Sequence, residues 1–332
     1  MRWPAEWEPH TATWLSWPRN PDTWPKNLRA AQQEFAAFIR AVAEVETVNL
    51  LCGGDAMQSA RAAVGGIRNV ELIDIQTNDA WIRDYGPTFV NRDNKQVVVD
   101  WTYNAWGGKY PPFDQDAKIA EKIATRLNCA AIKVDRVIEG GTLEGNGAGL
   151  VMTTESCLLN ENRSGKSAKA QIESILKQRL GANEILWLSG GDIAGDDTDG
   201  HIDQIARFVS EKTIVVCVEK NRDDVNFETF QLASRELKQF NAEHGNQFEI
   251  VDLPMPGPVM FDGVRLPAGY ANFYLANGIV IVPQFDDPAD EIAVSLLKSV
   301  FPDRQAIALP SRNLSVGLGS FHCLSQQQPA QP

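Results

Sequence analysis

One cysteine near the end of the chain has neighbours unlike those of the other cysteines. Cys323 follows the glycine-containing run Gly317-Leu-Gly-Ser-Phe321, stands next to His322 and precedes a serine and several glutamines. Glycine lets a backbone approach a ligand closely, and polar neighbours can hold a thiolate. The other four lie in or beside apolar runs, in which a cysteine usually packs as a small hydrophobe. They are Cys52, Cys129, Cys157 and Cys217. Cys323 is therefore our candidate nucleophile, with a buried structural cysteine as the alternative.

The densest polar cluster in the chain is Gly195-Asp-Asp-Thr-Asp-Gly-His-Ile-Asp203, and we expect a strand directly after it. In extended backbone, residues i and i+2 face the same side, so His201 and Asp203 should point together. This pairing would place a proton carrier beside a carboxylate. Two alternatives stay open. A His-x-Asp pair can bind zinc or iron if a third ligand exists, and an acidic turn can carry an incidental histidine.

A second cluster, within Asn78-Asp-Ala-Trp-Ile-Arg-Asp-Tyr-Gly-Pro87, combines carboxylates with an aromatic ring. Asp79 and Asp84 lie on either side of Trp81 and Arg83 in the sequence. An aspartate beside an arginine most often forms a structural ion pair. A planar cationic substrate, however, is bound well by a carboxylate and an aromatic side chain together.

Together, these side chains predict chemistry on a guanidinium group. A guanidinium has a pKa of about 13, so its carbon is a poor electrophile and its amines are poor leaving groups. Asp84 and Asp203 can bind the N–H edges, and Cys323 can attack the carbon as a thiolate. His201 can protonate the departing amine and then activate water. Glu139, in the turn Ile138-Glu-Gly-Gly141, could orient His201 and support its charged form.

A period in the chain suggests how these residues are brought together. Asp84, Glu139, His201, Asn272 and Cys323 each open a β-rich run, and the gaps between them are 55, 62, 71 and 51 residues. Each interval contains about one candidate helix. The spacing predicts five supersecondary modules around a common axis, each delivering one polar residue to the centre.

Helix and strand signals interleave along the chain, which indicates the α/β class. Apolar residues at helical spacing predict long helices within 26–46, 119–127, 172–180, 230–240 and 292–300, and a shorter one over 56–64. Short β-rich runs begin near residues 88, 96, 149, 184, 205, 212, 248 and 278. No interdomain linker is evident, and the only low-complexity stretch is the tail, 326–332.

Composition narrows the class of protein. The chain has 332 residues, is 43% hydrophobic and carries a formal net charge of −12. This charge argues against a nucleic-acid partner and favours a cationic ligand, although acidity also serves solubility. No apolar run reaches the roughly 18 residues that span a bilayer, and the start lacks a signal-peptide pattern. Five cysteines without a C-x-x-C motif fit a reducing compartment. We therefore expect a cytoplasmic protein that binds neither membrane nor nucleic acid.

The chain resembles the agmatine deiminases, which belong with the microbial-type peptidylarginine deiminases to the guanidine-modifying pentein superfamily. The resemblance extends in order from residue 3 to about residue 328. Its motifs are Trp3-Pro-Ala-Glu-Trp-Glu-Pro-His10, Asn78-Asp-x-Trp-x-Arg-Asp-x-Gly-Pro87, Glu139-Gly-Gly, Asp196-Asp-Thr-Asp-Gly-His-Ile-Asp203, Ala271-Asn-Phe-Tyr274 and His322-Cys323-x-x-Gln-Gln. The chain departs from the family pattern at Gly269 and in the run 317–321.

The resemblance implies a single catalytic domain over 1–332, folded as a five-bladed α/β propeller of pseudo-repeats. It implies that Cys323 becomes amidinated, that His201 is the general acid and base, and that Glu139 pairs with His201. The remaining implied site residues are Asp84 and Asp203, which would bind the guanidinium, Asn272 at the pocket and Trp81 along the substrate channel.

The implied reaction converts agmatine and water to N-carbamoylputrescine and ammonia, a step of polyamine biosynthesis, without metal or organic cofactor. Agmatine ends in an ammonium group that needs a negative partner, and we choose Asp197 among the acids near His201. A deiminase acting on peptidyl-arginine or another guanidino compound is the nearest alternative. A silent guanidine- or polyamine-binding protein and a zinc hydrolase are two others. A homodimer is an arrangement that the sequence leaves open.

Overall fold

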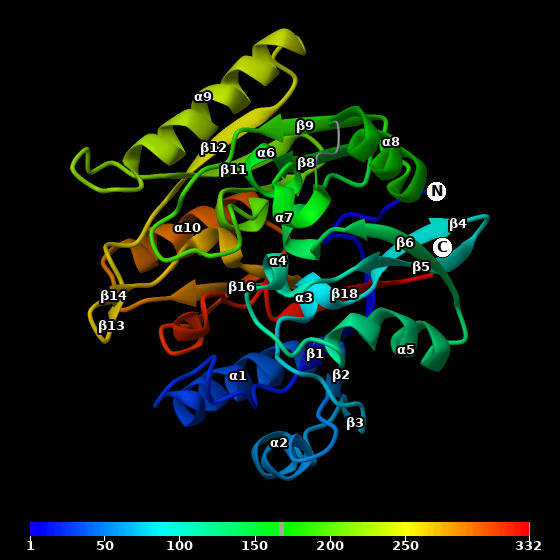
Figure 1. Ribbon diagram of the computed structural model, residues 1–332. Helices are drawn as coiled ribbons and strands as arrows, with labels where there is room; N and C mark the ends of the chain where they lie inside the picture. Colours follow the sequence, from blue (N-terminus) through cyan, green and yellow to red (C-terminus); the bar gives the residue numbers. More distant parts are fainter. Residues whose placement is uncertain (166–168, 332) are drawn as a thin grey trace.

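The fold is built around five small sheets with long helices on their outer sides, and a two-stranded hairpin forms a sixth sheet. The computed structural model describes residues 1–165 and 169–331. Each of the five sheets contains an antiparallel strand pair and a further strand that runs parallel after a helical crossover. In Figure 1 the long helices lie at the periphery, while β18 and α3 lie near the centre. The predicted α/β class and five-module arrangement are confirmed.

Four modules follow the order strand, strand, helix, strand, and each helix crosses over to bring the last strand parallel to the second. The second module contains β4 (Thr88–Arg92), β5 (Lys95–Thr102), α4 (Ala105–Gly108), η1 (Asp116–Lys118), α5 (Ile119–Arg126) and β6 (Ala130–Val137). The third contains β7 (Glu144–Gly145), β8 (Leu150–Thr154), α6 (Glu155–Leu158), α7 (Glu161–Ser164), α8 (Lys169–Leu180) and β9 (Glu184–Leu188).

The fourth and fifth modules repeat this order and are joined by a small hairpin. The fourth contains β10 (Ala206–Ser210), β11 (Thr213–Val218), α9 (Phe227–Glu243) and β12 (Glu249–Pro254). The hairpin strands are β13 (Met260–Phe261) and β14 (Val264–Arg265). The fifth contains β15 (Tyr274–Ala276), β16 (Ile279–Gln284), α10 (Ala289–Val300) and β17 (Gln305–Pro310).

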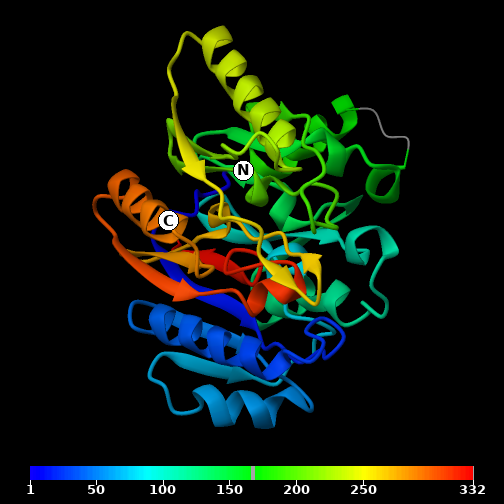
Figure 2. The same ribbon diagram turned by 90° about the vertical axis from the view of Figure 1, so that its left-hand side faces the viewer.

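The first module is closed by the two ends of the chain. Its elements are β1 (His10–Ser16), α1 (Leu28–Ala43), β2 (Thr47–Leu51), α2 (Ala56–Val64), β3 (Val70–Ile73) and β18 (Ser325–Pro329). Strand β18 pairs antiparallel with β1, so that Trp14 lies opposite Gln326. In Figure 2, α1 and α2 lie at the bottom of the molecule and α9 at the top, again on the outside. The sheet next to Cys323 therefore joins the first and the last strand of the chain.

The tail was interpreted from its composition as a low-complexity stretch, but in the structure residues 325–329 form a buried strand. Its glutamine side chains pair with buried polar groups. Gln327 accepts a hydrogen bond from the Arg83 guanidinium (2.7 Å), and Gln328 accepts one from the Trp14 indole (2.9 Å). Composition alone suggested low complexity, but an amide can satisfy both buried donors and acceptors.

The six predicted helices are confirmed as α1, α2, α5, α8, α9 and α10, with boundaries displaced by a few residues. Helix α1 shows why these segments are helical, because its Phe35, Phe38 and Val42 recur at helical spacing and are buried. None of the helices in the two described ranges combines the length and the apolar character that a bilayer crossing requires.

The five residues that recur once per module each lie on or beside a single helical turn that precedes a strand of that module. These turns are α3 (Ile82–Tyr85), η2 (Gly140–Thr142), η3 (Ile202–Gln204) and η4 (Tyr270–Asn272), together with the turn at 321–324 that follows η5 (Leu314–Gly317). His201 and Asp203 were expected on an extended segment, which is wrong, because they flank and occupy η3. The repeated turn places all five side chains at the centre.

Phe38 of α1 supports the turn that carries Cys323. Its ring stacks on Phe321 at a centroid distance of 4.8 Å and meets Tyr274 edge-on at 5.7 Å. All three rings are fully buried. A cavity at this position would therefore affect both the core and the Cys323 turn.

We predict that Phe38→Ala lowers the free energy of unfolding by about 3–5 kcal/mol, as expected for a buried phenylalanine. Chemical denaturation followed by fluorescence measures this change. Gln33→Ala, at an exposed position of the same helix, should change the stability by less than about 0.5 kcal/mol. Equal effects of the two substitutions would contradict the packing role of Phe38.

Candidate active site

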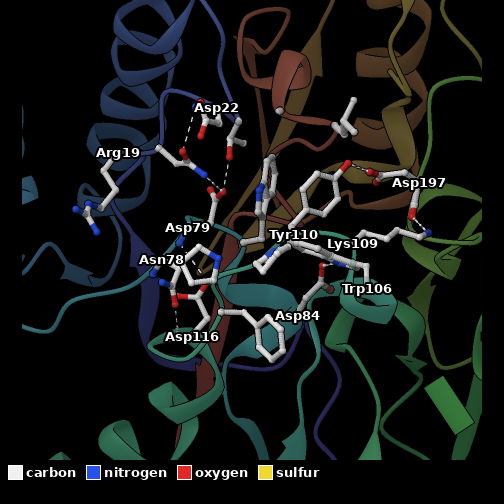
Figure 3. Close-up of a pocket in the computed structure, with 18 of the residues that line it drawn as sticks. Arg19, Asp22, Asn78, Asp79, Asp84, Trp106, Lys109, Tyr110, Asp116 and Asp197 are labelled. Carbon is white, nitrogen blue, oxygen red and sulfur yellow. Dashed lines mark hydrogen bonds between the residues drawn. The ribbon is translucent and has the colours of Figure 1, made fainter. Parts of the chain in front are cut away.

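The candidate site lies at a pocket of about 610 Å³ whose walls are acidic and aromatic. In Figure 3, Asp84 and Trp106 lie near the middle of the pocket, with Asp79 and Asp116 on one side and Asp197 on the other. Cys323 also borders this pocket. A cavity lined by carboxylates and aromatic rings suits an elongated cation.

The Cys323 thiol is nearly buried but reaches the pocket. The side-chain amide of Asn272 donates to Sγ at 3.0 Å, and Sγ lies 3.5 Å from Oδ2 of Asp203. Burial, followed by the charges of Asp203 and Asp84, raises the pKa of the Cys323 thiol well above its usual value. The thiol is therefore protonated in the free protein, and a cation bound between the aspartates would favour the thiolate.

Asp84 is held by two donors. The backbone N–H of Gly141 donates to Oδ1 at 2.9 Å, and the Trp106 indole donates to Oδ2 at 3.0 Å. Burial, together with the charges of Asp203 and Glu139, nevertheless raises the pKa of the Asp84 carboxyl well above its usual range. A cationic ligand beside Asp84 would therefore lower the pKa of its carboxyl and favour the ionised form.

Asp203 is buried in a different electrostatic environment. His322 Nδ1 lies 2.7 Å from its Oδ2. Burial favours the neutral acid, but the hydrogen bond and the charge of His322 outweigh it and lower the pKa of the Asp203 carboxyl. The pKa values of the two aspartates are therefore shifted in opposite directions, although burial favours the neutral form of both.

His201 is a buried imidazole without a hydrogen bond at either nitrogen among the residues described. Its Nδ1 lies 3.7 Å from Oδ1 of Asp84. Burial lowers the pKa of His201 to about 3, and the nearby Asp203 charge opposes this effect. The ring is therefore neutral near pH 7 and able to accept a proton.

Glu139 is near His201 but does not hydrogen-bond to it. Its Oε1 accepts from Arg163 Nε at 2.8 Å, and both side chains are fully buried. Its Oε2 has no hydrogen-bond partner within the described ranges. The expected pairing of Glu139 with His201 is thus replaced in this structure by an ion pair with Arg163, a residue that the sequence analysis did not identify.

Gly141 explains how these groups can lie so close together. A Cβ added at this glycine would be 2.5 Å from His201 Nδ1, 2.8 Å from Asp84 Oδ1 and 3.2 Å from Asp203 Oδ2. Any side chain would enter the space that the three functional groups share. The second glycine of the Glu-Gly-Gly motif is therefore required because there is no space for a side chain.

Two groups of acids line the ends of the pocket. Asp197 is half-buried and accepts a hydrogen bond from Tyr110, while Lys109 binds its backbone oxygen. At the other side, Asp79 accepts from Asn20 at 3.1 Å, and Asp116 accepts from the backbone of Asn78 at 2.7 Å. Burial raises the pKa of both the Asp79 and the Asp116 carboxyl.

Trp81 lines the pocket and stacks on Trp24 at a centroid distance of 5.5 Å. The glycines before Cys323 make room for these rings. A Cβ at Gly317 would be 2.7 Å from Trp24, and one at Gly319 would be 2.5 Å from Trp81. The run 317–321, where the chain departs from its family pattern, is therefore shaped by the pocket wall.

Sequence reasoning missed Trp106, whose indole binds Asp84. Its backbone has φ 54° and ψ 43°, a left-handed conformation that is unusual for a bulky side chain. The Gly107-Gly108 pair that follows it in the sequence indicates a turn but no chemistry.

A group of potential metal ligands is formed by Glu139, Cys157 and His201, whose ligand atoms lie within 4.8 Å of one another. A bound metal would have to compete with the partners that these side chains already have. Glu139 is paired with Arg163, and Cys157 donates to the backbone of Thr198 at 3.5 Å. The donor set does not fit a preformed metal centre.

Comparison with known sequences identifies a family. The family model described as Porphyromonas-type peptidyl-arginine deiminase matches residues 2–329. An agmatine deiminase of Pseudomonas aeruginosa (strain LESB58) is 38% identical over 354 residues, which cover 99% of this chain and 96% of the relative.

Solved structures agree with this match. A cysteine-to-serine variant of the C. jejuni agmatine deiminase with substrate bound is similar, with a TM-score of 0.92 and 33% identity, covering 99% of this chain and 96% of that chain. An amidinotransferase from Microseira wollei has a TM-score of 0.59 at 11% identity, covering 100% of this chain and 98% of that chain, which is a likeness of fold alone.

We predict that Gly141→Ala lowers kcat/KM for a guanidino substrate by about 100-fold, because displacing reacting groups by about 1 Å costs this much. Steady-state ammonia release measures the effect, and thermal unfolding checks the fold. Gly269→Ala is the control, since the added Cβ would meet Met255 at 3.5 Å, an ordinary contact. Full activity of the Gly141 variant would contradict the steric role of this glycine.

Proposed function

Because this chain belongs to the family of Porphyromonas-type peptidyl-arginine deiminases, we propose that it hydrolyses agmatine to N-carbamoylputrescine and ammonia. The observation that carries the proposal is the convergence of a thiol, an imidazole and two carboxylates beside an acidic pocket. Asp84, His201 and Asp203 all approach Gly141, and Asp203 lies 3.5 Å from the Cys323 sulfur.

Substrate binding is the first step. The guanidinium lies between Asp84 and Asp203 and donates hydrogen bonds to their carboxylates. Its charge favours the ionised form of Asp84, whose pKa is raised by burial in the free protein. The same charge favours the Cys323 thiolate, because it offsets the negative charges of Asp203 and Asp84, which add to burial in raising the pKa of the thiol.

Attack by sulfur is the second step. Cys323 Sγ forms a bond to the guanidinium carbon, and Asn272 donates a hydrogen bond to the sulfur. His201 accepts the thiol proton and transfers it to the departing nitrogen, so that ammonia leaves as the carbon–nitrogen bond breaks. The product of this step is an amidino-cysteine.

Hydrolysis is the third step. His201, neutral again, removes a proton from water, and the resulting hydroxide attacks the amidino carbon. The carbon–sulfur bond breaks, one of the two water protons returns to Cys323 and the other is released to solvent, and the neutral product leaves with a carbonyl oxygen from water. A neutral imidazole is required at this stage, which agrees with the low pKa of His201.

Agmatine is favoured over arginine by the charges along the pocket. Its free end is an ammonium group, whereas the free end of arginine includes a carboxylate. The pocket offers Asp197 at one end and Asp79 and Asp116 at the other. We assign Asp197 to the ammonium, because burial raises the pKa of the Asp79 and Asp116 carboxyls and so favours their neutral forms.

We further propose that the whole chain forms one catalytic domain that acts in the cytoplasm. The motifs that form the site extend from the second module to β18, which supports a single domain. All five cysteines are free, as is typical of a reducing compartment.

We predict that Cys323→Ser abolishes ammonia release from agmatine, because the hydroxyl is a far weaker nucleophile. In the unaltered protein, rapid acid quenching during turnover should reveal a mass increase on the peptide that contains Cys323. Cys217→Ser, which alters another buried cysteine, should retain both signals. An unaltered protein that binds agmatine but releases no ammonia would instead be a silent guanidine-binding protein.

We predict that Asp197→Asn raises KM for agmatine by about tenfold with a smaller change in kcat, because a charge-assisted hydrogen bond is worth about 1.5 kcal/mol or more. The same variant should not weaken the turnover of a blocked arginine peptide. Asp192→Asn is the matched control, since Asp192 is exposed and lies outside the pocket lining. Faster turnover of the peptide than of agmatine by the unaltered protein would overturn the substrate assignment.

A further inference from the structure

A second histidine lies behind the site, and the proposed reaction does not use it. We propose that His322 is held permanently as an imidazolium between Asp203 and Glu6, and that it acts as a positioning residue that keeps Asp203 ionised before substrate arrives. This inference rests on the proposed function for its catalytic consequence, whereas the charge of His322 can be tested without any turnover.

Both ring nitrogens of His322 face a carboxylate. Nδ1 lies 2.7 Å from Oδ2 of Asp203, and Nε2 lies 2.9 Å from Oε2 of Glu6. Ionised carboxylates only accept hydrogen bonds, while a neutral imidazole can donate from one nitrogen only. With both carboxylates ionised, both contacts are hydrogen bonds at the same time only if the ring carries two protons and a positive charge.

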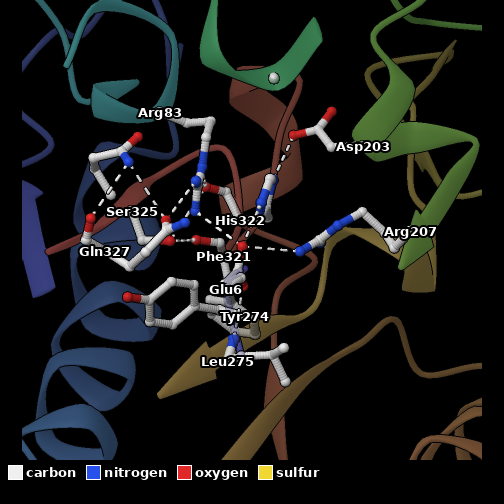
Figure 4. Close-up of polar contacts among 12 residues, drawn as sticks. Glu6, Arg83, Asp203, Arg207, Tyr274, Leu275, Phe321, His322, Ser325 and Gln327 are labelled. Atoms are coloured by element: carbon white, nitrogen blue, oxygen red, sulfur yellow. Dashed lines mark hydrogen bonds and ion pairs between the residues drawn. The ribbon is translucent and has the colours of Figure 1, made fainter. Parts of the chain in front are cut away.

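Glu6 has no room for a proton of its own. Its Oε2 also accepts from Arg207 at 2.9 Å and lies 3.4 Å from Arg83, and its Oε1 accepts from the backbone of Leu275 at 3.0 Å. Figure 4 shows these donors converging on Glu6. Burial favours the neutral acid, but Arg207 and His322 outweigh it, so the pKa of the Glu6 carboxyl lies well below its usual value.

A charged His322 balances the charges of this buried network when its three carboxylates are ionised, although burial raises the pKa of the Glu144 carboxyl. Its carboxylates are Glu6, Glu144 and Asp203, and its guanidinium groups are Arg83 and Arg207. All of these side chains are almost completely buried. Three negative and two positive groups would leave one uncompensated charge in the interior, which is costly. The imidazolium supplies the third positive charge.

The groups on the other side of Asp203 do not supply this compensation. His201 is neutral, Asp84 is acidic, and the Cys323 thiol is protonated because burial raises its pKa. Arg207 acts on Asp203 only through space and is bound to Glu144 and Glu6. His322 is therefore the cation that contacts Asp203 directly.

The arrangement divides the two oxygens of Asp203 between two tasks. Oδ2 is held by His322, while Oδ1 has no hydrogen-bond partner among the described residues. Oδ1 is thus left to accept an N–H of the substrate guanidinium. Because the imidazolium keeps Asp203 ionised, the free enzyme presents one prepared carboxylate, whereas Asp84 ionises when the substrate cation arrives.

The first test is NMR of the unaltered protein labelled with ¹⁵N-histidine. There are four histidines, and the His322 signals are those lost in the His322→Gln variant. Two equivalent protonated nitrogens should persist at pH values well above about 6.5, where a free imidazole becomes neutral. A neutral tautomer of His322 at pH 7.5 would overturn the proposal. Because no substrate is present, this result does not depend on the proposed reaction.

The second test is the pH dependence of kcat/KM for agmatine in His322→Gln. Without the imidazolium, the pKa of Asp203 rises, so activity should fall at low pH and recover as the pH increases. The acidic limb should move upward by about one to three pH units, the usual effect of a neighbouring opposite charge. A purely structural role would lower kcat/KM equally at every pH, and this outcome would also overturn the proposal.

Ser325→Ala is the matched control. Its hydroxyl donates to the backbone oxygens of Phe321 (2.7 Å) and His322 (3.2 Å), in the same turn but away from the imidazole. It should leave the acidic limb in place. If His322→Gln fails to fold, the pH profile of that variant cannot be measured. The His322 signals are then assigned from Glu6→Gln, in which their chemical shifts should change. If the unaltered protein releases no ammonia, the proposed function fails while the NMR result still stands.

Discussion

The structure depends on how carboxylates can be kept together in a buried centre. Asp84, Glu139 and Asp203 all lie within the interior, where an uncompensated charge is costly. Among the residues that the structure describes, each is compensated differently: Glu139 by Arg163, Asp203 by His322, and Asp84 by hydrogen bonds from Gly141 and Trp106 without a cation. The site thus has two carboxylates with cationic partners and one without. A cationic ligand supplies the positive partner that Asp84 lacks. The preference for a guanidinium therefore follows from the interior charges as much as from the pocket shape.

The repeated module is the means by which this arrangement is built. Each module places one helical turn before its first strand, and the turns α3, η2, η3 and η4 are in contact in sequence order. Hydrogen bonds from the Arg83 amide to the Cys323 oxygen and from the His322 amide to the Asn272 oxygen complete the circle. Residues far apart in the chain therefore meet through short, regular backbone segments rather than long loops. Such support suits a site whose groups must keep their distances.

Much of this fold could be predicted from the chain, because its helices have a clear apolar period and its polar residues recur at regular intervals. Several strands were missed, including β1 and β2, and two of them have patterns unlike those of the predicted strands. β6 is largely exposed, and β18 consists of serine, glutamine and proline, so neither presents an apolar run. In the site, residue types indicated the chemistry of Cys323 and His201. The pairing of Glu139 with Arg163 was not predictable, because it depends on the rotation of a buried side chain toward a partner on another element.

The pairing of β18 with β1 has a consequence for the assembly of the molecule. Trp14 and Gln326 are opposite neighbours in one sheet, although nearly the entire polypeptide separates them. Contacts between such remote segments are slow to form, because the entropy of closing a long loop must be overcome first. The nucleophile candidate lies immediately before this strand. A partly folded chain with four completed modules would accordingly contain the site's carboxylates and imidazole but not the thiol of Cys323. It would remain inactive until β1 and β18 pair.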